Sequence, residues 1–232
     1  MLKKIPSQKV LFLDIETVPE FQFWKELPED WQLLWTKKVE KQLKEDETPE
    51  EFYGNRAGIL AEFGKIICIS CGLIIDDHKI RLKSFYGDGE SQILKEFSEM
   101  ISGKYFDSNL ILCAHNGKEF DFPFLARRFI INGLEIPKAL DLQGKKPWEV
   151  PHLDTMELWK FGDYKHFTSL NLLAAVLGIP TPKDDIDGSQ VASVYYEDRD
   201  LERIKTYCEK DVLTVAQIFR KFRGEDLLER ED

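Results

Sequence analysis

Acidic residues stand in three separate stretches of the chain where a folded core would normally carry apolar side chains. In the first stretch, Asp14 and Glu16 end the apolar run from Val10 to Leu13, which predicts a buried strand closed by Pro19. Residues two apart on a strand share a face, so the two carboxylates lie side by side. Such a pair repels and resists desolvation, which predicts raised pKa values or a cation between the carboxylates.

The segment 200–222 supplies a further acid from a predicted amphipathic helix. Its apolar residues recur at spacings of three and four and form a seam: Leu201, Ile204, Cys208, Val215, Ile218 and Phe222. Asp211 falls within this seam, and Tyr207 lies one turn earlier on the same helix surface. An unpartnered carboxylate there would cost several kcal/mol, so the pattern predicts a partner for Asp211.

Taken singly, these residues also have ordinary structural interpretations. Asp121 stands two residues before Pro123 at a predicted helix start, where a capping Asp is common. Asp14 alone fits the end of a strand, and Tyr207 alone fits a core position. Their occurrence together, with Asp211 in an apolar seam, favours a functional site.

Carboxylate oxygens are the ligands that Mg²⁺ and Mn²⁺ prefer, and four of them suit two divalent ions. Two such ions can activate a water and stabilise the leaving oxygen of a phosphodiester, which makes phosphoryl transfer the expected chemistry. Tyr207 is suited to orienting that water through its hydroxyl, since an ordinary phenol pKa near 10 makes it a poor base at neutral pH.

The 232 residues suit a single domain spanning 1–232. Mean hydropathy is -0.35, and no apolar run reaches the roughly 20 residues that span a bilayer, so we expect no membrane association. Lys3 and Lys4 precede only a short apolar run, which disfavours a secretory leader and predicts a cytoplasmic protein. The net charge of -10 argues against nonspecific coating of nucleic acid but leaves room for a locally basic groove.

The four cysteines do not suggest a disulfide scaffold. Cys68 and Cys71 form a C-x-x-C pair, but their odd offset on a predicted strand points them to opposite faces. Because no second pair follows, the sequence disfavours a zinc or redox centre.

Strands are predicted early, with helices between them and a largely helical second half, which indicates an α/β domain with one mixed central sheet. A hairpin is expected from segments 65–75 and 79–86, a short strand near 152–156, and helices near 92–101, 119–133, 168–178 and 189–197. Residues of about 20–60 form a charged, Trp-rich helical insertion whose stripe, Trp31, Leu34, Trp35, Val39 and Leu43, favours packing over base stacking. The acids can converge at one edge of the sheet.

Three motifs occur in the order expected of a known group of nucleases. LDIET carries the first acid pair, HNGKEFDFPFL carries Asp121, and YCEKD carries Tyr207 and Asp211. The chain thereby resembles the DEDD superfamily of 3′-to-5′ exonucleases, whose fold is ribonuclease-H-like with three α/β/α layers. It resembles the tyrosine subgroup, because the histidine of the other subgroup would fall at Thr206. It looks closest to predicted stand-alone exonucleases related to the proofreading domain of family-B DNA polymerases.

That resemblance implies a role for each matching residue. Asp14 would bridge two ions, Glu16 and Asp211 would hold the ion beside the nucleophile, and Asp121 would act on the second ion. Tyr207 would position the nucleophile. The residues implied or suggested as nucleotide contacts are Thr17, Asn116 and Phe120 for the terminal nucleotide and, more weakly, Lys165 and Lys183 for phosphates.

The predicted function is therefore metal-dependent hydrolysis at the 3′ end of a single strand, with DNA favoured over RNA. An RNA exonuclease using the same site is the first alternative, since discrimination through the 2′-hydroxyl cannot be read from this sequence. A non-catalytic nucleic-acid-binding module of the same fold is the second. Protein partners are not predictable from the sequence.

Overall fold

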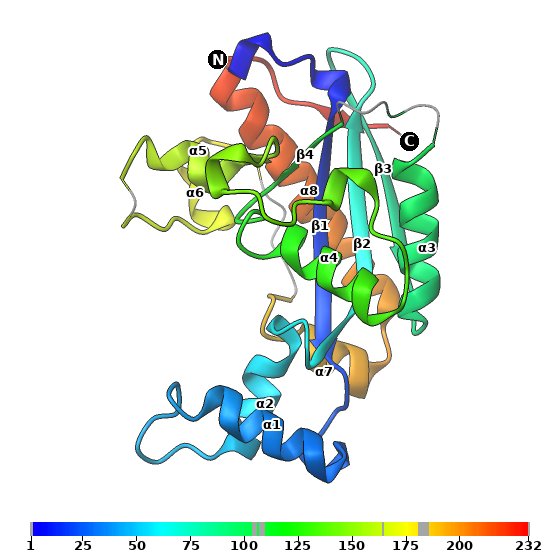
Figure 1. Cartoon of the computed structure of the whole chain (residues 1–232). Helices are drawn as coiled ribbons and strands as arrows, with labels where there is room; N and C mark the ends of the chain where they lie inside the picture. The colour runs from blue at the N-terminus through cyan, green and yellow to red at the C-terminus, as the bar shows by residue number, and fades with distance from the viewer. Residues whose placement is uncertain (1, 104–105, 107–109, 164, 181–185, 232) are drawn as a thin grey trace.

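A six-stranded mixed sheet forms the centre of the computed structural model, with strand order β5-β4-β1-β2-β3-β6 (Figure 1). The structure describes all residues except 1, 104–105, 107–109, 164, 181–185 and 232. The strands are β1 (Val10–Pro19), β2 (Gly64–Ile74), β3 (Lys79–Tyr86), β4 (Ile111–Ala114), β5 (Leu153–Asp154) and β6 (Glu229–Arg230). β1, β2 and β3 pair antiparallel in sequence, whereas β4, β5 and β6 each join a neighbour in parallel.

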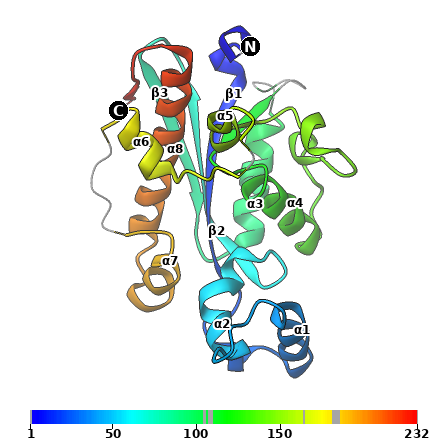
Figure 2. The same cartoon turned by 90° about the vertical axis from the view of Figure 1, so that its left-hand side faces the viewer.

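Helices cover both faces of this sheet. They are α1 (Glu29–Val39), α2 (Pro49–Arg56), α3 (Glu90–Ile101), α4 (Asp121–Ile131), α5 (Thr155–Lys160), α6 (Leu170–Val176), α7 (Val191–Ser193) and α8 (Leu201–Arg223). Figure 2 shows α8 on one side of β1 and β2, and α3 with α4 on the other. The expected three-layer α/β/α architecture, consistent with a ribonuclease-H-like fold, is thereby confirmed.

The two faces of β1 contribute to two different cores. Leu11 and Leu13 pack into the cluster that contains residues of α3 and α4, whereas Val10 and Phe12 pack against α8. Because both faces are covered, the strand reads as a continuous apolar run. Asp14 and Glu16 extend the α8-facing register of Val10 and Phe12, so the acid pair lies between the sheet and α8.

One edge of β1 lies open where the acids stand. The parallel pairing of β1 with β4 joins Val10 to Ile111 at one end and Phe12 to Cys113 at the other, and β4 ends at Ala114. Within the described residues, no strand pairs with β1 beyond Phe12 on this side. The backbone there is available to groups arriving from other segments.

The helical insertion has a core of its own. Trp35 and Val39 of α1 are fully buried with Tyr53 of α2, and the indole Nε1 of Trp35 donates to the carbonyl of Pro49 at 2.7 Å. Packing of the helix is therefore confirmed for these two residues. Trp31 is exposed on one side but packs edge-on against Phe63, with ring centroids 5.6 Å apart, whereas Leu34 is exposed. The helix α1 ends at Val39, and Leu43 packs against the same core from beyond that end.

Most predicted elements are confirmed, with shorter bounds in the second half. The hairpin β2–β3 and the long helix α8 occupy the expected residues. The segment 191–198 is a short α-helix followed by a π-helical turn, and α5 was not expected at all. Cys68 and Cys71 contribute to cores on opposite faces of the sheet, as their spacing predicts. In the part of the chain that the structure describes, no helix has the length and apolarity needed to cross a membrane.

Candidate active site

Asp14 and Glu16 meet the side chain of Cys208 between β1 and α8. The Cys208 thiol donates to Oδ2 of Asp14 at 3.3 Å and approaches the Asp14 carbonyl oxygen at 3.4 Å. One donor atom from each of the three residues lies within 4.8 Å of the other two. Glu16 is 8% exposed and Cys208 is fully buried, whereas Asp14 is half-buried, so the acid pair lies largely within the protein with Asp14 still reached by solvent.

Asp121 reaches this position from the opposite helix layer. It is the first residue of α4, only 3% exposed, and its carboxylate accepts the backbone N–H of Ile15. That N–H lies between the two acids of β1, on the strand that β4 leaves unpaired after Phe12. The open edge of β1 therefore holds Asp121 next to the acid pair.

The third segment, α8, adds Asp211 and Tyr207. The Tyr207 hydroxyl donates to the Asp211 carboxylate, and Asp211 interacts electrostatically with both Asp14 and Glu16. Tyr207 is half-buried and packs at the edge of the cluster containing Cys208. The structure thus brings together the four acids and the tyrosine from β1, α4 and α8, as the sequence motifs suggest.

Burial and repulsion between carboxylates raise the pKa values of three acids of the site, Asp14, Glu16 and Asp121. Burial raises the pKa of Asp14 well above its usual range, with repulsion from Glu16 next, and the Cys208 hydrogen bond partly opposes the rise. The pKa of Glu16 rises for the same reasons, with Asp211 the chief repelling charge. Burial raises the pKa of Asp121 to about 7, although the Ile15 N–H opposes the shift. Burial, then repulsion from Asp211, also raises the Tyr207 hydroxyl pKa, which excludes Tyr207 as a base near neutral pH.

The loop between β4 and α4 is held by Asp154. Its carboxylate accepts the backbone N–H of Asn116 at 3.0 Å and that of Lys118 at 3.1 Å, as well as two N–H groups at the start of α5. Asn116 adopts a positive φ of 65°, a conformation that Asn tolerates better than most residues. Asp154 therefore fixes the loop that delivers Asp121 to β1.

The predicted nucleotide-contact residues are placed unequally. Thr17 is half-buried beside Glu16, at a register shift in the pairing with β2. Asn116 places its side-chain oxygen in a buried position without a hydrogen-bond partner among the described residues. Phe120 leans on Phe124, with ring centroids 5.4 Å apart, and packs partly into the core.

The structure describes no contact between the two lysines suggested as phosphate ligands, Lys165 and Lys183, and the acid site. Lys165 lies exposed in the loop after α5, where its backbone N–H is bound by Asp163, and no described contact joins it to the acid cluster. Lys183 lies outside the described residues. The structure therefore leaves the suggestion of phosphate contacts by these lysines untested.

Two residues at the site were not assigned a site role from the sequence. Cys208 was taken as an apolar member of the helix seam, although its position three residues before Asp211 places it on the same helix surface. Asp154 lies outside the three motifs. An Asp directly before a helix commonly caps that helix, so the sequence could have indicated the cap that Asp154 provides for α5. The sequence gives no sign of the hydrogen bond that Asp154 accepts from Asn116, 38 residues away.

A family model described as a predicted 3′-5′ exonuclease related to the exonuclease domain of PolB matches residues 59–227. This chain belongs to that family. The match includes Asp121, Tyr207 and Asp211 but begins after Asp14 and Glu16, so the structure is what places the first acid pair at the site. Membership confirms the expected relation to family-B proofreading domains.

Two DNA polymerases are similar to this chain at low sequence identity. The chain is 23% identical over 146 residues to a DNA polymerase of Pyrococcus glycovorans, a match covering 57% of this chain and 18% of the polymerase. It shares its fold with the family B DNA polymerase of the archaeon Pyrobaculum calidifontis, with a TM-score of 0.57, 15% identity, and coverage of 89% of this chain and 23% of that chain. The chain thus spans less than a quarter of the length of either polymerase.

The donor set suits hard divalent cations. Carboxylate oxygens select Mg²⁺ or Mn²⁺, and the acids repel one another and raise one another's pKa, a repulsion that a bound cation would relieve. Asp14, Glu16, Asp121 and Asp211 are the residues that could hold such ions. The Cys208 thiol, a softer donor, also lies within reach of the first two.

Proposed function

We propose that this protein is a metal-dependent 3′-5′ exonuclease that hydrolyses the terminal phosphodiester bond of a single strand, with DNA as the favoured substrate. The observation that carries this proposal is the meeting of four carboxylates and one tyrosine, from three distant segments, at the open edge of β1. Family membership supports the reaction class. The pair Tyr207 and Asp211 supports the further proposal that the chain is of the tyrosine subgroup, and we propose that residues 1–232 act as one domain.

Two divalent ions bound by the four carboxylates would activate a water and stabilise the leaving 3′ oxygen. The residues that would hold these ions are Asp14, Glu16, Asp211 and Asp121, with Asp14 expected to serve both ions, Glu16 and Asp211 the ion beside the nucleophile, and Asp121 the other. The Tyr207 hydroxyl, whose raised pKa keeps it protonated, orients the attacking water by a hydrogen bond. Asn116, Thr17 and Phe120 contact the terminal nucleotide.

An RNA strand is the second substrate considered, because the acids act on the phosphodiester and the choice between DNA and RNA rests on contacts to the 2′-hydroxyl. A non-catalytic binding module is the less favoured function. Buried carboxylates that repel one another cost stability, and a module that only binds nucleic acid gains nothing from them. We further propose a cytoplasmic location.

The test uses matched DNA and RNA strands that carry a label at either end, incubated with Mg²⁺, Mn²⁺ or a chelator. A 5′ label should give a ladder of shortening strands, and a 3′ label should be released at once as a mononucleotide, in both cases only with metal. The ratio of DNA to RNA rates settles the sugar preference. Release of a mononucleotide from the 5′ end, or cleavage that persists in chelator, would contradict the proposal.

A further inference from the structure

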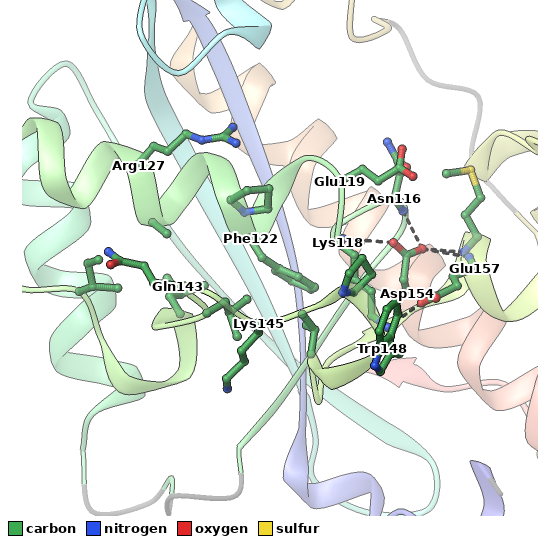
Figure 3. Close-up of a pocket in the computed structure, with 18 of the residues that line it drawn as sticks. Asn116, Lys118, Glu119, Phe122, Arg127, Gln143, Lys145, Trp148, Asp154 and Glu157 are labelled. Atoms are coloured by element: carbon green, nitrogen blue, oxygen red, sulfur yellow. Dashed lines mark hydrogen bonds and ion pairs between the residues drawn. The ribbon is translucent and has the colours of Figure 1, made fainter.

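A second concave region lies beside the acid site and has the chemistry of a nucleotide-binding groove. It is a cavity of about 900 Å³, bounded by α4, the segment 136–150 and α5 (Figure 3). The four acids and Tyr207 are absent from its described lining. Its volume falls in the usual range for small-molecule sites.

Apolar side chains form much of the cavity wall. Its lining includes Phe122 and Ile130 of α4 together with Ile136 and Leu140. Trp148 lies on the short 3-10 helix Pro147–Glu149 and is 77% exposed, which is unusual for the largest apolar side chain. Since an indole face is a good stacking surface for a base, a ligand with an aromatic ring fits this lining.

The polar groups of the cavity favour an anion. Arg127 and Lys145 lie toward one end together with Gln143, as Figure 3 shows, and no described ion pair neutralises either cation. Of the three acids in the lining, Glu157 pairs with Lys118 at 2.6 Å and Asp154 accepts four N–H groups, which leaves Glu119 as the acid without a described ion pair. This end of the cavity is locally positive although the whole protein has a net charge of -10, and a locally positive surface suits phosphate.

The cavity adjoins the acid site through one loop. Asn116 and Asp154 line the cavity, and the same loop continues into Asp121, the first residue of α4. The Asn116 Oδ1 atom is buried without a hydrogen-bond partner among the described residues. A strand with its 3′ end at the acids can therefore continue past Asn116 into the cavity.

We propose that this cavity binds the nucleotides that lie 5′ of the scissile bond. Arg127 and Lys145 contact phosphates of the strand, and one base stacks on Trp148. This inference rests on the proposed function for the direction of the strand. A free mononucleotide, such as the reaction product, carries the same chemistry and is the alternative occupant that the experiment separates.

Binding is measured by fluorescence anisotropy in chelator, so that no strand is shortened, using 5′-labelled DNA of about eight nucleotides and a labelled dinucleotide. The full-length protein is compared with an Arg127→Ala/Lys145→Ala double variant and with Trp148→Ala. Lys95→Ala, an exposed cation of α3 that does not line the cavity, is the matched control.

The longer strand should bind wild type at least about tenfold more tightly than the dinucleotide does, and the double variant should lose that advantage. The slope of log affinity against log salt should fall by about one for each phosphate contact removed. Trp148→Ala should weaken the longer strand alone, and Lys95→Ala should change nothing. Equal binding of both lengths to wild type, or an unchanged affinity and salt slope in the double variant, would overturn the proposal.

A titration with dAMP, followed by Trp fluorescence, separates the two occupants. Quenching that Trp148→Ala abolishes, with strand affinity unaffected by any variant, would make the cavity a mononucleotide site and overturn the strand proposal. The exonuclease proposal fails by a different observation: wild type would shorten no strand in Mg²⁺ or Mn²⁺. An enzyme that shortens strands but whose double variant binds them normally would overturn only the cavity inference.

Discussion

The thiol of Cys208 donates a hydrogen bond to Oδ2 of Asp14 across 3.3 Å, joining α8 to the central acid of β1. Cys208 follows Tyr207 directly and faces the same space as Asp211. The thiol therefore orients the carboxylate expected to be shared by both ions. Partners of this kind set the geometry and basicity of a metal ligand.

Replacing Cys208 with Ala should weaken Mn²⁺ binding by roughly tenfold to a hundredfold, the usual cost of losing an outer hydrogen bond to a ligand. Cys208→Ser should restore most of the affinity, because a hydroxyl also donates to Asp14. Isothermal titration calorimetry of the three proteins gives the comparison. If Ala and Ser bind Mn²⁺ as wild type does, the thiol has no positioning role.

Tyr207→Phe removes the hydroxyl that donates to Asp211. We expect turnover to fall by up to about a hundredfold, since a misoriented water loses the near-attack geometry, while Mn²⁺ affinity stays within error of wild type. Single-turnover shortening of a labelled strand measures the first quantity and calorimetry the second.

Tyr195→Phe is the matched control for this change. It also removes a tyrosine hydroxyl from a carboxylate, that of Asp88 at 2.8 Å, which is not one of the four acids of the site. Its turnover should equal that of wild type. Normal turnover in Tyr207→Phe would remove the proposed role of the phenol.

Asp121→Asn should change how the stability of the metal-free protein depends on pH. Burial raises the pKa of Asp121 from 3.8 to about 7, so the folded state holds this proton more tightly than the unfolded state. The stability gained from that proton is complete below about pH 4 and is lost as pH rises through about 7. Asn keeps an oxygen for the Ile15 N–H without the charge, so the variant should be more stable than wild type above pH 7, by a few kcal/mol at most.

Urea unfolding in chelator at pH 4 and pH 8 measures this difference, with the exposed neighbour Glu119→Gln as control. The advantage of Asp121→Asn should be large at pH 8 and small at pH 4. An advantage that is independent of pH would show that Asp121 is ionised in the folded protein at both values.

Asp154→Ala should lower both stability and activity, because this carboxylate caps α5 and holds the loop before Asp121. Loss of the cap should cost about 0.5–2 kcal/mol. Ser169→Ala removes the cap of α6 and serves as control, since Ser169 binds the Leu172 N–H without touching the loop. Turnover should fall in Asp154→Ala at a temperature where both variants are folded, and equal turnover in the two would refute the loop-positioning role.

The sequence predicted the convergence of the acids because each acid interrupts a strong local pattern. Asp211 breaks a helix seam, and Asp14 with Glu16 breaks an apolar strand. The Asp121 contact with Ile15 depends on β4 ending early, which is a property of strand pairing over about 100 residues. The periodicity of apolar residues does not predict where β4 ends or how far its pairing with β1 extends.

The loop and the cavity were beyond prediction for a related reason. Asp154 binds N–H groups 36 and 38 residues away, and Trp148 stands on a short 3-10 helix in a segment without apolar periodicity. The exposure of Leu34 shows the converse error, in which a helical spacing predicted packing that the small core of the insertion does not provide.

We propose above that the four carboxylates form one site for divalent ions. Titration of Mn²⁺, followed by the loss of its free-ion electron paramagnetic resonance signal, tests this claim for wild type and Asp14→Asn at neutral pH. Wild type should bind two ions, and Asp14→Asn, which lacks the shared ligand charge, should bind at most one and more weakly. Absence of binding by wild type, or identical isotherms for the two proteins, would contradict the account.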